Sequence, residues 1–224
     1  MARVAWAYLQ GKLGTSLEVI GVSEEANGKY EATEHLNEAV EADRAALHVM
    51  TMESDPENWA DTQDTLGDAL QELGKRERNT NDLEQAIAAY LEAGKVQTRD
   101  RDPISWAATQ NSIANTYEVL GMREPGTTGM VHLQQAVTAY EAALTVSTPD
   151  NDPVNWPISE DNLARTQSEL GEREAGTNYL QQAAASYREE LKYVSPDRSP
   201  TRWKDASEGL NNVLNLLRSR GVTG

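Results

Sequence analysis

The chain has 224 residues, of which 38% are hydrophobic and 25% are charged, as in ordinary soluble folded proteins. It has no cysteine, which excludes disulfides and thiolate metal sites and fits a cytoplasmic location, and it has no apolar run long enough to span a membrane. A net charge of −16 disfavours nucleic acid and anionic membranes, because both would be repelled, and it favours either a basic partner or solubility alone.

Tryptophan marks a repeated pattern that begins in the first residues, MARVAWAYLQGK, which we interpret as a helix rather than a signal peptide. A leucine or isoleucine follows each tryptophan by seven residues, and a glycine follows by fifteen in every copy but the last. The tryptophans are Trp6, Trp59, Trp106, Trp156 and Trp203. Rare residues in such a register indicate tandem helical repeats.

The clearest copy, DPISWAATQNSIANTYEVLG, runs from Asp102 to Gly121 and has the features of one complete helix. Asp102 can cap the first backbone N–H groups, and Pro103 suits the first helical position. Gly121 favours a left-handed helix end, so we predict that the glycine of each copy stops the helix. We expect each tryptophan to pack against the second helix of the preceding repeat rather than to stack on a ligand.

A second helix follows each first helix, with spaced leucine, alanine, tyrosine and alanine, as in LEQAIAAYLEA from Leu83. Thr33, Thr80 and Thr177 stand three residues before the leading leucine and are candidate helix caps. Asp43 takes the place of the tyrosine in the first repeat, which we expect to be poorly packed or to form an edge.

In chain order these segments predict nine helices, as four pairs and a last single helix. The expected ranges lie near 3–20, 31–50, 56–73, 80–97, 103–120, 128–146, 155–170, 177–193 and 200–219. We predict one array over 1–224, with repeats near 3–50, 56–97, 103–146 and 153–193 and a capping helix over 200–219. Three asparagines of that last helix suit a face on which nothing packs: Asn211, Asn212 and Asn215.

The second repeat resembles the tetratricopeptide repeat. The matching positions are Gln63, Leu66, Gly67, Leu70, Ala86, Tyr90, Ala93 and Pro103. Successive tryptophans are 53, 47, 50 and 47 residues apart, so the chain is similar to a long bacterial variant of this family, whose usual repeat has about 34 residues. The resemblance implies an all-α, right-handed solenoid whose first helices line a concave groove for protein segments.

The family's groove positions can be carried over by aligning the leucine that follows each tryptophan. The groove residues that result from repeats two to four are Asp61, Asp64, Asp68, Glu72, Asn111, Asn115, Glu118, Asp161 and Arg165. In the first repeat the same positions are Tyr8, Gly11, Thr15, Glu18 and Val19. Such a groove is acidic in its middle, and its asparagines can bond a peptide backbone. It lacks the basic set with which the family holds a peptide carboxylate, Arg165 apart.

No motif for catalysis or metal binding is present, so we expect no enzyme activity, no cofactor and no metal. The sequence has neither a phosphate-cradling glycine loop nor a nucleophile motif. His35 and His132 share one first-turn position, two repeats apart, which we expect to be exposed and which does not bring them to one metal.

The sequence therefore favours a non-enzymatic interaction scaffold that binds a peptide or protein segment of basic character in its groove. The alternative is a structural or regulatory array that self-associates as a homo-oligomer, with the imperfect first repeat as its interface. A third interpretation is that the acidic groove is simply a solvated face, with no ligand.

Overall fold

The structure is a computed structural model, and it describes residues 2–23 and 29–222. Within those residues it contains nine helices and no strand, which confirms the all-α prediction. The helices are α1 (Ala2–Ser23), α2 (Lys29–Leu47), α3 (Pro56–Glu77), α4 (Thr80–Ala93), α5 (Pro103–Arg123), α6 (Gly126–Leu144), α7 (Trp156–Arg173), α8 (Asn178–Glu190) and α9 (Pro200–Ser219). They form two compact units, Met1–Thr116 and Tyr117–Gly224, whose boundary falls inside α5.

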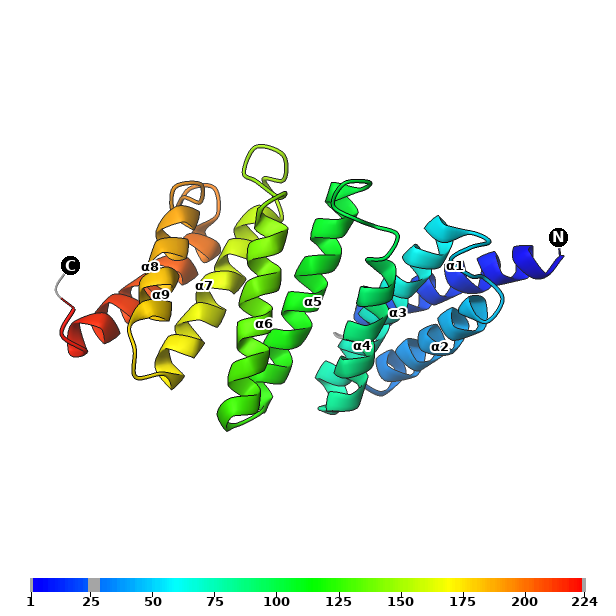
Figure 1. Cartoon of the computed structure of the whole chain (residues 1–224), viewed down its shortest axis with the longest axis horizontal. Coiled ribbons are helices and arrows are strands. Elements are labelled where there is room, and N and C mark those ends of the chain that lie inside the picture. The colour runs from blue at the N-terminus through cyan, green and yellow to red at the C-terminus, as the bar shows by residue number, and fades with distance from the viewer. Residues whose placement is uncertain (1, 24–28, 223–224) are drawn as a thin grey trace. The chain divides into compact units, whose positions relative to one another are not determined.

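In the first unit, consecutive helices pack as pairs. α1 packs on α2 and α3 packs on α4, while α2 also contacts α3 (Figure 1). α1 touches α3 directly as well. A second helix therefore lies against the first helices of two successive repeats, as in stacked helical repeats.

The second unit is built in the same way. α7 packs on α6 and α8, and α9 covers α8 and reaches α7. Its core contains Ala164, Leu180, Ala183, Tyr187 and Val213. The outer face of α9 is polar, because Asn211, Asn212 and Asn215 are all exposed, as the sequence predicts.

The glycines that follow the tryptophans do not end their helices, so that prediction is wrong. α3 continues past Gly74 to Glu77, and the chain leaves the helix at Arg78, whose φ of 56° is left-handed. α5 continues in the same way past Gly121 to Arg123. The local preference of glycine for a helix end is overridden at these positions.

Close packing explains why glycine stands at these positions instead. A Cβ atom on Gly74 would lie 2.7 Å from the Cγ atom of Leu83, the leucine that opens α4. The same contact occurs between Gly171 and Leu180, where the distance would be 2.6 Å. Each glycine is thus a notch that receives the first leucine of its own second helix.

The predicted caps are only partly correct. Asp102 caps α5, because its Oδ1 atom accepts a hydrogen bond from the Ser105 N–H at 3.1 Å. Thr33 lies inside α2, and α4 is capped by Asn79 rather than Thr80, so those two predictions are wrong. Thr177 occupies the cap position of α8 without a capping hydrogen bond from its side chain.

Two of the five tryptophans, Trp59 and Trp156, are buried core residues, and Trp106 is half-buried. Trp59 is buried with Met50 of the preceding repeat and with Ala93. Trp6 is 46% exposed and Trp203 is 39% exposed, so the core prediction is wrong for these two. For Trp6 the reason is that no described helix precedes α1. Trp203 is exposed although α8 packs on α9, so a preceding second helix alone does not bury this tryptophan.

In the first unit, the recurring tyrosine position of the second helix packs on the first helix of the same repeat. Tyr90 packs over Gly67 of α3, where an added Cβ would lie 2.5 Å from the ring. In the first repeat Asp43 fills the same position over Gly14.

The extra loop length between the first two helices includes residues 24–28, which lie outside the described residues.

Candidate functional site

A hollow of about 240 Å³ lies between α1 and α3, the first helices of repeats one and two. The residues that line it include Tyr8, Gly11, Lys12, Thr15, Asn58, Asp61 and Thr62, and the Lys12 ammonium lies over the Tyr8 ring, 5.4 Å from its centroid. Four of these, Tyr8, Gly11, Thr15 and Asp61, are positions that the sequence assigned to a groove. The repeat register thus brings predicted groove residues from two helices to one surface.

Three acidic residues follow one another along α3 beside this hollow. Asp61 is exposed, and one of its oxygens accepts a hydrogen bond from the Gln97 amide at 3.3 Å. Asp64 accepts one from the Thr109 hydroxyl at 3.2 Å, and Asp68 accepts one from the Tyr90 hydroxyl at 2.7 Å. Asp61 and Asp64 are therefore hydrogen-bonded to neutral donors, and neither forms an ion pair within the described residues.

Burial and mutual repulsion disfavour the ionised form of the buried carboxyls in this row. Burial raises the pKa of Asp64 to about 7, the charges of Asp68 and Asp61 add to the rise, and the Gln97 and Thr109 hydrogen bonds oppose it. Burial likewise raises the pKa of Asp68. In α1, burial and then the charges of Asp68 and Glu72 raise the pKa of Glu18.

Glu72 is the member of the predicted set in α3 that is already neutralised. Its Oε1 atom lies 2.8 Å from Nε of Arg76, one turn along the helix. The neighbouring Gln71 is buried, and its amide donates to the Ser112 carbonyl at 3.1 Å, which ties α3 to α5. These two positions contribute to packing more than to an open surface.

The predicted asparagines of α5 are half-buried. The Oδ1 atom of Asn111 is buried and has no hydrogen-bond partner among the described residues. Asn115 lies one turn further along the same helix. Whether either bonds a peptide backbone stays a prediction.

In the second unit, Glu118 and Arg165 bind each other. Glu118 is buried, and it accepts hydrogen bonds from the Tyr140 hydroxyl at 2.9 Å and from Nη2 of Arg165 at 2.7 Å. Arg165 also lies 3.5 Å from Asp161. Two predicted groove residues thus form an ion pair with each other, in which Glu118 is buried and the Arg165 side chain is 48% exposed.

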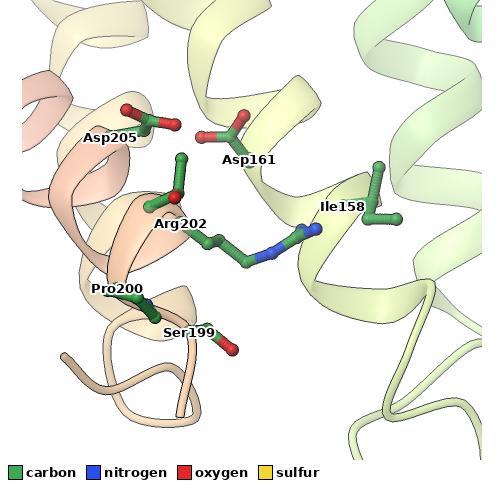
Figure 2. A pocket seen from close by; sticks show the side chains of 7 residues that line it. Ile158, Asp161, Ser199, Pro200, Arg202 and Asp205 are labelled. Carbon is green, nitrogen blue, oxygen red and sulfur yellow. The ribbon is translucent and has the colours of Figure 1, made fainter. Parts of the chain in front are cut away.

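A larger hollow, of about 420 Å³, lies between α7 and α9 (Figure 2). The carboxylates of Asp161 and Asp205 point toward each other from the two helices, and Arg202 extends from α9 toward α7. Burial raises the pKa of Asp161, while the charges of Arg165 and Arg202 lower it. This hollow already contains the cation that its acids attract.

Two carboxylates that sequence reasoning did not assign to a site are fully buried, and no described residue donates a hydrogen bond of good geometry to their oxygens: Asp43 and Glu190. Burial raises the pKa of Asp43 to about 7, and it raises that of Glu190 to about 8 with help from the charge of Asp161. A sequence signal existed for both, since Asp43 replaces the repeat's tyrosine and Glu190 stands where the other repeats have alanine.

A recurring arginine was also missed. An arginine follows four of the five tryptophans by seventeen residues: Arg76, Arg123, Arg173 and Arg220. Arg173 donates to the Gly121 carbonyl at 2.8 Å, and Arg220 donates to the Gly171 carbonyl at 2.7 Å. Arg173 and Arg220 thus each link the end of their own helix to the end of the preceding first helix.

The described residues contain no cluster of three histidine, cysteine or acidic side chains able to hold a metal ion. His132 is half-buried rather than exposed, because its ring stacks on Tyr117 with centroids 5.8 Å apart. No helix in the described ranges has the length and apolar character needed to cross a membrane.

A comparison with protein families matches residues 59–93, most of α3 and all of α4, to the tetratricopeptide repeat. This range contains Asp61, Asp64 and Asp68, the acidic row beside the first hollow. No curated protein matches the chain.

Proposed function

Because the chain carries a tetratricopeptide repeat, a kind of repeat that generally mediates protein–protein interaction, we propose that its first unit binds a basic segment of another polypeptide. The segment lies in the hollow between α1 and α3, and its lysine or arginine side chains contact Asp61 and Asp64. The chain acts as a non-enzymatic interaction scaffold.

The crowding of acids along α3 is the observation that supports this proposal. The carboxylates of Asp61, Asp64 and Asp68 repel one another, and this repulsion contributes to the raised pKa of Asp64. A cation placed between Asp61 and Asp64 would replace that repulsion by attraction, and partial burial strengthens the interaction. Binding would therefore lower the pKa of Asp64.

The shape of the hollow favours a side chain or a narrow extended segment. Its volume of about 240 Å³ is too small for a folded domain, and its walls carry hydroxyl and amide groups beside the Tyr8 ring. Lys12 of the chain itself lies over the Tyr8 ring, so an incoming lysine or arginine stem packs beside these two residues while its charged end reaches Asp61.

The first unit suits a basic partner better than the second. The hollow between α7 and α9 holds Arg202 beside Asp161 and Asp205, and Glu118 is neutralised by Arg165. A cation from outside would compete with these arginines. The hollow of the first unit also holds a cation, Lys12, but its ammonium lies over the Tyr8 ring, and within the described residues no ion pair joins it to Asp61 or Asp64.

A synthetic peptide of alternating lysine and alanine, labelled with a fluorophore, tests the proposal by fluorescence anisotropy on the full chain. We expect binding that weakens steeply as salt is added, and the double change Asp61→Asn and Asp64→Asn should weaken it by about tenfold or more. Asparagine keeps the size of the side chain and its hydrogen-bonding oxygen, so the fold is preserved.

The control has the same net charge as the test variant. Asp150→Asn with Asp197→Asn removes two exposed acids from linkers of the second unit. If the control weakens the peptide as much as the test variant does, the attraction is only that of an acidic chain, and the proposed site is wrong. An unchanged affinity in the test variant has the same meaning.

A further inference from the structure

One face of α1 carries an exposed apolar stripe, which we call the outer stripe and define as Trp6, Leu9, Leu13, Leu17 and Ile20. Trp6, Leu9, Leu13 and Ile20 are 46%, 64%, 45% and 40% exposed, and Leu17 is half-buried. Their spacing of three, four, four and three residues aligns them along the helix. Uncovered apolar side chains over four helical turns are costly in water.

The outer stripe is distinct from the other two faces of α1. Ala7, Gly11 and Gly14 are buried and face the rest of the first unit. Tyr8 and Thr15 line the hollow proposed to bind a basic segment. The stripe therefore has a role in neither the core nor that hollow.

The repeat itself shows what this face is for. The residues of α3 at the positions of Trp6, Leu9, Leu13 and Ile20 lie 53 residues later, and all four are buried: Trp59, Thr62, Leu66 and Leu73. The corresponding residues of α7 are buried too: Trp156, Ser159, Leu163 and Leu170. α3 and α7 each pack on a preceding second helix, α2 and α6. At α1 the same face has no covering helix in the described chain.

We propose that the outer stripe of α1 is covered by the outer stripe of a second copy, in a symmetric dimer. The stripe is a palindrome of positions about Leu13, since Leu9 and Leu17 lie four residues to either side and Trp6 and Ile20 lie seven. In an antiparallel pair with a two-fold axis at Leu13, each Trp6 faces Ile20 of the partner subunit. A two-fold interface requires such self-complementarity.

The charge distribution also favours a second copy. The sequence of α1 contains one acidic residue, Glu18, and two basic residues, Arg3 and Lys12, whereas the chain as a whole carries −16. None of these three belongs to the outer stripe. Two stripes therefore meet without bringing charged side chains together, although the two acidic chains repel each other at longer range. We expect added salt to strengthen the dimer, the opposite of its effect on a basic peptide.

The expected dimer is concentration-dependent. The stripe spans fourteen residues of helix, or about 21 Å. A single pair of helices of this length makes a small interface, so we expect the dimer to dissociate on dilution.

Sedimentation of the full chain over a range of concentrations tests the proposal. We expect a monomer–dimer equilibrium, and we expect Leu9→Glu or Leu13→Glu to abolish the dimer, since a buried unpaired carboxylate disfavours the interface. Val19→Glu and Leu91→Glu are the matched controls, because both residues are more than half exposed, lie off the stripe and gain the same charge. Circular dichroism shows whether each variant keeps its helices.

Cysteine substitution tests the symmetry, because the chain has no cysteine of its own. Under mild oxidation Leu13→Cys should form a disulfide-linked dimer, whereas Val19→Cys should not. A mixture of Trp6→Cys and Ile20→Cys chains should cross-link as heterodimers far more than either chain alone.

A chain that stays monomeric at every concentration would overturn the proposal, and so would a dimer that survives both glutamate substitutions. A dimer that cross-links through Val19→Cys in preference to Leu13→Cys would place the interface on another face of α1 and would also contradict it. None of these outcomes affects the proposed peptide site, which is tested at Asp61 and Asp64.

Discussion

At the scale of single residues, this fold depends on small residues in one helix that receive large ones from the next. Gly74 and Gly171 receive Leu83 and Leu180, and Gly67 receives the ring of Tyr90. A glycine within a helix normally lowers its stability by about 1 kcal/mol relative to alanine. Close packing outweighs that preference at these positions.

Gly171→Ala should therefore destabilise the second unit, although alanine is the better helix former. The new Cβ would lie about 2.5 Å from the Leu180 Cδ2 atom, which forces the leucine or the helix to move. We expect the free energy of unfolding to fall by about 1–2 kcal/mol, since overpacking costs about 1–3 kcal/mol and helix propensity returns part of it. Urea denaturation followed by circular dichroism measures the change.

Gly176→Ala is the control for that measurement, because nothing lies within 4 Å of its added Cβ and the residue is exposed. It should leave the urea midpoint almost unchanged. Equal effects of the two alanines would mean that the notch does not determine stability.

At the scale of helices, successive first helices are joined at their ends by arginine. Arg220 leaves the end of α9 and donates to the carbonyls of Gly171 and Gly176 at 2.7 and 2.6 Å, near the end of α7. Carbonyls at a helix end lack intrahelical partners and carry partial negative charge. One nitrogen of the guanidinium, Nη1, donates to both carbonyls, one in the last turn of α7 and one in the loop that follows it.

Arg220→Met should weaken the docking of α9 while keeping the aliphatic part of the side chain. Charged hydrogen bonds contribute about 1.5–3 kcal/mol, and we expect a loss of about 1–2 kcal/mol because the site is partly exposed. Hydrogen exchange should show the amides of α9 opening sooner than those of α7. Arg198→Met, at an exposed linker position, should change neither measurement.

The order of the helices and several of their first residues could be predicted from the sequence, but the residues at which the helices stop could not. Tryptophan, leucine and proline recur at fixed spacing, and helices begin at Pro56, Pro103 and Pro200 as expected. The glycine positions were misinterpreted because their local preference points to a helix end, while their real constraint is a leucine from another helix. Such a constraint is visible only when the two helices are packed.

Part of the geometry of the candidate site follows from the sequence. Repeat register places Asp61 and Tyr8 at one hollow, and whether that hollow binds a ligand stays a prediction. It could not indicate that Arg165 would bind Glu118, which is 47 residues away in the chain, because that pairing depends on the distance between two helices. Register gives the face of a residue but not its partner.

At the scale of the whole molecule, both units contain buried carboxyl groups whose ionised form is disfavoured. The pKa of Asp43 and of Asp64 is raised to about 7 in the first unit, and in the second the pKa of Glu160 is raised to about 7 and that of Glu190 to about 8. A carboxyl with a raised pKa holds its proton in the folded state at a pH where the unfolded chain has lost it. These groups therefore stabilise the fold at low pH, and the contribution is lost as pH rises through 7 to 8.

The urea midpoint of the full chain should accordingly fall between pH 5.5 and pH 8.5. Asp43→Asn with Glu190→Gln should raise the free energy of unfolding at pH 8.5 by about 3 kcal/mol, because the amides are never charged, and should flatten the dependence on pH. These two residues are the best choice since both are fully buried. Asp150→Asn, in an exposed linker, serves as control.

A stability that rises between pH 5.5 and pH 8.5 would contradict this interpretation of the buried acids. A double variant with the same pH dependence as the parent chain would mean that other groups carry the effect.

The asparagines on the outer face of α9 limit how copies of this chain can assemble. Covering Asn211, Asn212 and Asn215 would require a partner able to bond three amide side chains, and the apolar stripe of α1 offers no such groups. Head-to-tail growth into filaments is therefore disfavoured. An apolar stripe that pairs with its own copy forms a closed two-fold interface, which ends assembly at a finite pair.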